Sequence, residues 1–118
     1  MGAAFQELLD RVRSEVSSVS AVEAKSRLGN GAHPLLVDVR EREAFSDGYI
    51  PGAENIPRGF LELQIEGVSN DRSRVILLYG DDDQSPLATR DLVNMGYEDV
   101  AYIDGGVEAW QAAGFDIT

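Results

Sequence analysis

The sequence contains no cysteine, and this absence excludes several kinds of chemistry at once. Without a thiol, the chain can form neither a disulfide nor a thiolate metal site, and it has no cysteine nucleophile. Histidine is almost as scarce, because His33 is the only one. One histidine without any cysteine is too small a donor set for a transition-metal site. We therefore expect no transition-metal site and no cofactor.

The sequence also has no long hydrophobic run and few positively charged residues. No apolar stretch approaches the ~18 residues of a membrane-spanning helix, and the start of the chain lacks the features of a signal peptide. The 21 acidic residues outnumber the 10 basic ones, which gives a formal net charge of -11. Such a surface repels nucleic acid and anionic membranes and favours basic partners. These features predict a cytoplasmic protein, a monomer or weak homodimer, that binds a basic protein and neither nucleic acid nor membrane.

With 118 residues, the chain has enough length for one hydrophobic core and not for two. Near the N-terminus, apolar residues recur at the spacing of one helical face, at Phe5, Leu8, Leu9 and Val12. We expect an N-terminal amphipathic helix within residues 1–18 and a single domain over residues 19–118. The helix either packs on its own domain or serves for docking or dimerisation.

Three short apolar runs predict buried strands, at residues 34–39, 75–79 and 100–103. Between the last two, residues 85–96 have the pattern of a helix, with Ser85 as the expected N-cap and Pro86 in its first turn. Buried strands that alternate with amphipathic helices indicate an α/β fold with a largely parallel sheet. Ligands of such sheets bind beyond the carboxyl ends of the strands, so the segment after Tyr79 is the candidate site.

Four ordered segments make the sequence resemble a rhodanese homology domain. They lie at residues 36–41, 48–57, 96–100 and 104–110, and the likeness runs in the family's order from about Ser20 to the C-terminus. The resemblance implies a rhodanese-like α/β fold, with a central parallel sheet of about five strands flanked by helices. The N-terminal helix would be added to this fold.

The resemblance also implies a chemistry, which belongs to sulfur metabolism. In the family, a cysteine at the end of the central strand takes a sulfane sulfur from a donor such as thiosulfate and carries it as a persulfide to a thiophilic acceptor. A loop of about six residues curls around the sulfur, so that backbone N–H groups and a helix N-terminus hold the anion and lower the thiol pKa. Phosphatases of the same fold also use a cysteine in this loop.

This chain departs from the family at that loop, which reads Tyr79, Gly80, Asp81, Asp82, Asp83, Gln84 and Ser85. Matching Tyr79 to the family's tyrosine places Gly80 at the cysteine position, whereas matching Ser85 without a gap places Tyr79 there. Neither a glycine nor a phenol with a pKa of ~10 replaces a thiolate. Gln84 stands where the family often has an arginine, so a cation that could hold an oxyanion is missing too.

The three adjacent acids of the loop would repel an anionic donor, by on the order of 1 to 4 kcal/mol for each close pair of charges. Two roles for Asp81, Asp82 and Asp83 stay open. They could bind Mg²⁺ or Ca²⁺, although no calcium-loop pattern is present. Alternatively they are solvated near the positive end of the following helix, where their carboxylates could fill the amide-lined nest of the missing anion.

Four residues are expected at the rim of the loop. Asp38 and Arg40 match the family's Asp-x-Arg element, for which the resemblance implies a structural ion pair. Tyr49 stands where the family often has a histidine, and packing is its expected role. Arg58 is expected to form a surface salt bridge or, alternatively, to face the loop. We expect His33 to be an exposed loop residue rather than a catalytic base.

Two functional hypotheses follow. In the first, the chain is a rhodanese-like module without sulfurtransferase activity that binds or regulates a partner through its acidic loop and rim. In the second it is an enzyme, either a sulfurtransferase whose cysteine was lost in this copy or a carboxylate- or metal-assisted hydrolase that uses residues 81–83. The apolar stretch at residues 60–65 leaves one more alternative open, because it suits either a core helix or an exposed contact patch.

Overall fold

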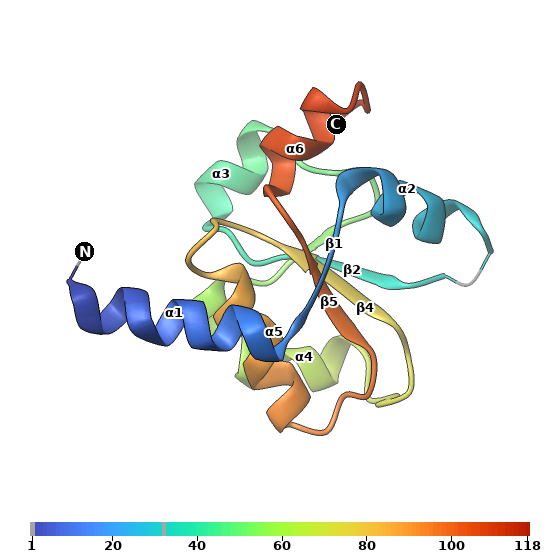
Figure 1. Ribbon diagram of the computed structural model, residues 1–118. Helices are drawn as coiled ribbons and strands as arrows, with labels where there is room; N and C mark the ends of the chain where they lie inside the picture. The colour runs from blue at the N-terminus through green and yellow to red at the C-terminus, as the bar shows by residue number, and fades with distance from the viewer. Residues whose placement is uncertain (1, 32) are drawn as a thin grey trace.

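A five-stranded parallel sheet forms the centre of the protein in a computed structural model that describes residues 2–31 and 33–118 (Figure 1). In spatial order the strands are β1 (Ser17–Val19), β5 (Val100–Ile103), β4 (Ile76–Tyr79), β2 (Leu35–Asp38) and β3 (Glu54–Asn55). Every neighbouring pair is parallel. All residues of the three central strands are buried, as expected for strands covered on both faces. The predicted α/β fold with about five parallel strands is therefore confirmed.

Helices cover both faces of the sheet (Figure 1). Helices α4 (Leu61–Val68) and α5 (Ser85–Asn94) lie on one face, where α1 (Ala3–Glu15) packs against α5. Helices α2 (Ala21–Gly29) and α6 (Gly106–Ala112) cover the other face. The short α3 (Arg42–Asp47) and the 3₁₀ turn η1 (Arg58–Phe60) lie in the connections on either side of β3. Two hydrophobic clusters, one on each face, hold these layers together.

The N-terminal helix α1 packs on its own domain, which was one of its two predicted roles. Leu9 and Val12 are each 2% exposed, while Phe5 and Leu8 are half-buried. The chain then enters the sheet directly, because Ser17–Val19 forms the edge strand β1 beside β5. No helix in the described part of the chain is long and apolar enough to cross a membrane.

Helices α2 and α6 are joined by aromatic and cationic contacts. The Nζ atom of Lys25 lies 5.7 Å from the ring centroid of Trp110 and 5.6 Å from that of Phe115. A cation over an aromatic face is attracted by the negative charge density of the ring. The indole N–H of Trp110 donates to the carbonyl oxygen of Asp116 at 2.8 Å. These contacts fix α6, whose start borders the candidate site.

The apolar stretch at residues 60–65 is divided between the core and the surface. Leu61 and Ile65 lie on the inner side of α4 and are fully buried, as expected for a core helix. Phe60 and Leu63 point outward instead, and 52% and 82% of their surfaces are exposed. Helix α4 therefore carries apolar side chains both toward the core and toward solvent.

Candidate functional site

The site begins where β4 ends, at the boundary between Tyr79 and Gly80. The Tyr79 side chain is fully buried, and its hydroxyl oxygen accepts a hydrogen bond from the Ile50 N–H at 3.1 Å. Burial, together with the neighbouring carboxylate of Asp38, raises the pKa of the Tyr79 phenol far above its ordinary value. This phenol stays protonated and has no access to a substrate. Tyr79 is therefore no replacement nucleophile.

Gly80 is packed so closely against the Val39 side chain that there is no room for a side chain of its own. A Cβ atom built at Gly80 would lie 2.6 Å from Cγ2 of Val39, far inside the normal separation of carbon atoms. On the other side, a Cβ built at Gly106 would lie 2.9 Å from the carbonyl oxygen of Gly80. Gly106 also has a φ of 56°, which favours glycine. Glycine at position 106 therefore lets the start of α6 approach the Gly80 carbonyl, and glycine at position 80 lets the loop pack against Val39.

The loop closes on itself through backbone hydrogen bonds. The N–H groups of Gln84 and Ser85 donate to the carbonyl oxygen of Asp81 at 2.9 and 3.0 Å. The Ser85 hydroxyl donates to the same oxygen at 3.2 Å. The sequence suggested that aspartate carboxylates bind the loop amides in place of an anion. For the Gln84 and Ser85 N–H groups this is wrong, because both are bonded to the Asp81 carbonyl oxygen. The N-cap prediction is also wrong by one residue: Gln84 is the N-cap of α5, and Ser85 lies buried in its first turn.

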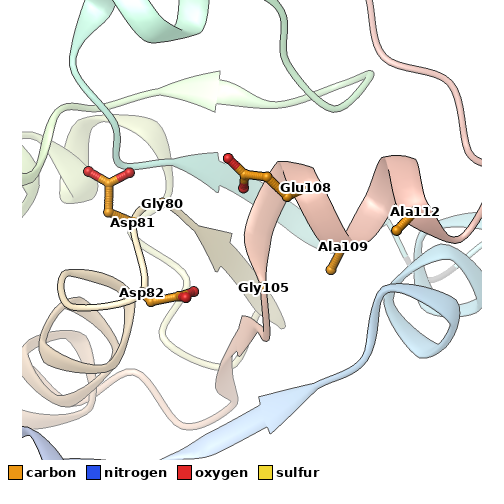
Figure 2. Close-up of a pocket in the computed structure, with 7 residues that line it drawn as sticks. All are labelled: Gly80, Asp81, Asp82, Gly105, Glu108, Ala109 and Ala112. Atoms are coloured by element: carbon orange, nitrogen blue, oxygen red, sulfur yellow. The ribbon is translucent and has the colours of Figure 1, made fainter.

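A hollow of about 490 Å³ lies between this loop and α6 (Figure 2). Its lining comprises Gly80, Asp81, Asp82, Gly105, Glu108, Ala109 and Ala112. Figure 2 shows Asp82 pointing from the loop toward α6, and Glu108 pointing from α6 toward the loop. Three of the lining side chains are therefore acidic and none is basic. The hollow repels an anion and attracts a cation.

Residues 81–83 do not form a metal site. Among residues 2–31 and 33–118, no group of three or more histidine, cysteine or acidic side chains is arranged to hold a metal ion. Asp81 and Asp82 are exposed, while Asp83 and Gln84 are half-buried and lie outside the lining of the hollow. The hydrolase alternative, with a metal at these acids, lacks the ligand geometry it requires.

The rim is held by the ion pair expected between Asp38 and Arg40. Nη2 of Arg40 lies 2.7 Å from Oδ2 of Asp38, and Nε donates to the same carboxylate at 3.1 Å. Nη2 also donates to the Gly48 carbonyl oxygen at 2.7 Å. The Asn55 amide donates to the carbonyl oxygens of both Asp38 and Arg40. The pair thus ties the end of β2 to the connections around β3, which is a structural use of the charges.

Tyr49 and Arg58, the other two rim residues, are engaged in packing and ion pairs. The Tyr49 ring stacks on Phe45 with a centroid distance of 4.1 Å, in agreement with a packing role. The Arg58 guanidinium binds the carboxylates of Glu62 and Asp91, on α4 and α5, so it forms salt bridges and does not line the hollow. His33 is exposed, as expected.

Two residues reach the site from elements that sequence reasoning had not connected with it. Glu108 lines the hollow from α6, about one helical turn after the glycine pair. Arg13 on α1 donates from Nη2 to the Asp82 carbonyl oxygen at 3.0 Å and so holds the loop from the other side. No local pattern points to either residue, because both positions depend on how α1 and α6 pack.

Comparisons with known proteins agree with the fold. Residues 20–113 match the family described as the rhodanese-like domain. The thiosulfate sulfurtransferase GlpE of Pseudomonas putida (strain GB-1) is 35% identical over 79 residues, which cover 66% of this chain and 70% of that protein. The crystal structure of the Alr3790 protein from Anabaena sp. is 35% identical, with a TM-score of 0.77 over 85% of this chain and 90% of the other. A thiosulfate sulfurtransferase structure from Pseudomonas aeruginosa, 26% identical, has a TM-score of 0.86 and covers 98% of this chain and 22% of its own.

Proposed function

Because this chain belongs to the rhodanese-like domain family, we propose that it is a sulfurtransferase homologue without sulfur-transfer activity that serves as a binding or regulatory module. One observation carries the proposal. At the head of the loop, where the family's nucleophile is expected, the chain has Gly80, and a side chain there would run into Val39.

The chemistry of sulfur transfer supports this proposal, since the transferred atom must be received by a thiolate. The chain contains no thiol, and the one phenol beside the loop, that of Tyr79, is buried and protonated. The loop amides of Gln84 and Ser85 are already bonded to a carbonyl oxygen. The site therefore lacks the nucleophile, and these two N–H groups are not free to bind an anion.

The electrostatics of the hollow indicate the kind of partner. Asp81, Asp82 and Glu108 face a space of about 490 Å³, and the chain as a whole carries a net charge of -11. We propose that a basic segment of a protein partner places an arginine or lysine side chain there. The cytoplasmic location and the monomeric or weakly dimeric state expected from the sequence belong to the same proposal.

A sulfur-transfer assay tests the first half of the proposal. The purified chain is incubated with thiosulfate and cyanide, with the Pseudomonas putida GlpE relative as the positive control. We expect no thiocyanate above background and no gain of one sulfur atom in the intact mass. Turnover, or a stable sulfur adduct on this cysteine-free chain, would contradict the proposal.

A titration tests the second half. A short oligo-arginine peptide is added to isotope-labelled protein at low salt, and amide shifts are followed by NMR. We expect shifts at Gly80, Asp82 and α6, and at least tenfold weaker binding when Asp81, Asp82 and Glu108 are all changed to their amides, since each charge contributes ~1 kcal/mol or more at contact. The exposed Asp47→Asn variant is the matched control and should bind normally. Shifts spread evenly over the acidic surface would refute a specific site.

A further inference from the structure

Two large apolar side chains on η1 and α4, Phe60 and Leu63, are exposed to solvent. Leu63 is 82% exposed and Phe60 is 52% exposed, while Leu61 and Ile65 on the same helix are fully buried against the sheet. A surface helix normally has one apolar side, turned toward the core. Leu63 departs from this rule, because it lies on the solvent side of α4 and no described part of the chain covers it.

Two glycines make this outer face accessible. Gly67 lies four residues after Leu63 on α4, about one helical turn away, and Gly59 lies in the preceding turn η1. A Cβ atom built at either glycine would meet no heavy atom within 4 Å. The space at these two positions is therefore open, and another chain can approach Leu63 there. We call Gly59, Phe60, Leu63 and Gly67 the α4 patch.

The charges beside the α4 patch favour one kind of partner. Glu62 precedes Leu63 and is paired with Arg58. Glu66 follows it by three residues, is exposed, and forms no ion pair with any residue that the structure describes. An apolar surface next to an unpaired carboxylate is complementary to apolar side chains next to a positive charge.

A second copy of this chain fits the α4 patch poorly. Two copies that each carry a net charge of -11 repel each other. The helix has eight residues and is about 12 Å long, which is too short to supply the roughly 800 Å² per partner of a stable specific interface. A short segment of another protein needs less area, and a basic one is attracted by the charge.

We propose that the α4 patch is a docking surface for a short apolar and basic segment of a partner protein. The segment would cover Leu63 and Phe60 with its apolar side chains and place an arginine or lysine beside Glu66. This surface is separate from the acidic hollow, because α4 and α6 cover opposite faces of the sheet (Figure 1). The inference therefore does not depend on the proposed function.

The test uses a synthetic amphipathic peptide with leucines on one face and arginines beside them. It is titrated into isotope-labelled full-length chain, and amide shifts are followed by NMR. We expect shifts concentrated at residues 59–67 and about tenfold weaker binding in Leu63→Ser, because a leucine side chain loses its burial in the complex. Val22→Ser is the matched control, since Val22 is 63% exposed but lies on α2, across the sheet. Glu66→Gln should weaken binding and reduce its dependence on salt.

Several outcomes would overturn the proposal. These are an absence of binding, shifts at the hollow instead of residues 59–67, and equal losses in Leu63→Ser and Val22→Ser. Sedimentation of the chain alone gives a further check, because a dimer that Leu63→Ser dissociates would identify a second copy as the occupant. Changing Asp81, Asp82 and Glu108 to their amides should leave the binding of this peptide to the α4 patch intact. This variant therefore distinguishes a failure of the docking proposal from a failure of the proposed function.

Discussion

Placing a cysteine at position 80 should lower the free energy of unfolding, unless Val39 is made smaller at the same time. In Gly80→Cys, the new Cβ lies 2.6 Å from Cγ2 of Val39, where carbon atoms normally stay about 3.5–4.0 Å apart. Such overpacking of a well-filled core costs about 1–3 kcal/mol. Val39 is itself only 2% exposed, so its core contacts limit how far it can move away.

A double-mutant cycle isolates this contact. Val39→Ala alone removes two buried carbon atoms, at about 0.8 kcal/mol each, and so costs about 1.6 kcal/mol before any cavity is counted. In the double variant the overlap does not arise, because Cγ2 is gone. The double variant should therefore lose less stability than the sum of the two single variants, by about 1–3 kcal/mol.

The measurement is urea unfolding of all four proteins, followed by the fluorescence of Trp110, the only tryptophan. Gly29→Cys is the matched control, because a Cβ there meets nothing within 4 Å, and its effect should simply add to that of Val39→Ala. Additivity of Gly80→Cys and Val39→Ala to within about 0.5 kcal/mol would refute the steric reasoning. Neither cysteine variant should take sulfur from thiosulfate while the acids line the hollow. A persulfide on Gly80→Cys alone would favour the alternative of an enzyme that lost only its cysteine.

Three further predictions concern the surroundings of the loop. Asp38→Ala should lower the free energy of unfolding by about 3 kcal/mol, because it breaks a buried ion pair. Arg27→Ala, which breaks an exposed ion pair, should lower it by less than about 1 kcal/mol, and similar losses for both variants in chemical denaturation would argue against a structural role of the Asp38–Arg40 pair. Gly106→Ala should lower the free energy of unfolding by at least about 1 kcal/mol more than Gly114→Ala does. Both glycines have a positive φ, but only a Cβ at position 106 meets the Gly80 carbonyl oxygen, and equal melting temperatures would disprove that contact. Because the folded-state pKa of Tyr79 is raised, its unfolded-state phenol ionises first, so stability should fall as the pH rises above ~10; Tyr79→Phe should flatten this decline, and an unchanged slope would refute the burial argument.

The centre of the sheet could be predicted from the sequence, but its edges could not. Strands β2, β4 and β5 are runs of apolar residues, because they are covered on both faces. At the edges, β1 buries only Val19, and β3 has two residues, Glu54 and Asn55, of which neither is apolar. These edge strands form because a neighbouring strand offers hydrogen bonds, which no local pattern reveals.

The candidate site was predictable in its chemistry and not in its shape. The missing thiol, the acids of the loop and the Asp38–Arg40 pair are all visible in the sequence. The contact between Val39 and Gly80, and the arrival of Glu108 from α6, depend on packing between distant segments. Helix α5 also begins differently from the Ser-Pro pattern, since its N-cap is Gln84, whose N–H group donates to the carbonyl oxygen of Asp81.

The position of Lys25 offers a way to observe the site without introducing a foreign residue. It is the only lysine, so reductive methylation with isotope-labelled methyl groups would mark one side chain in addition to the chain's terminal amine. Methylation keeps the positive charge, and the label would lie within 6 Å of the ring centroids of Trp110 and Phe115, whose ring currents shift its resonance. Because Trp110 and Glu108 belong to the same helix, this single resonance would serve as a built-in reporter of movement in the wall of the hollow.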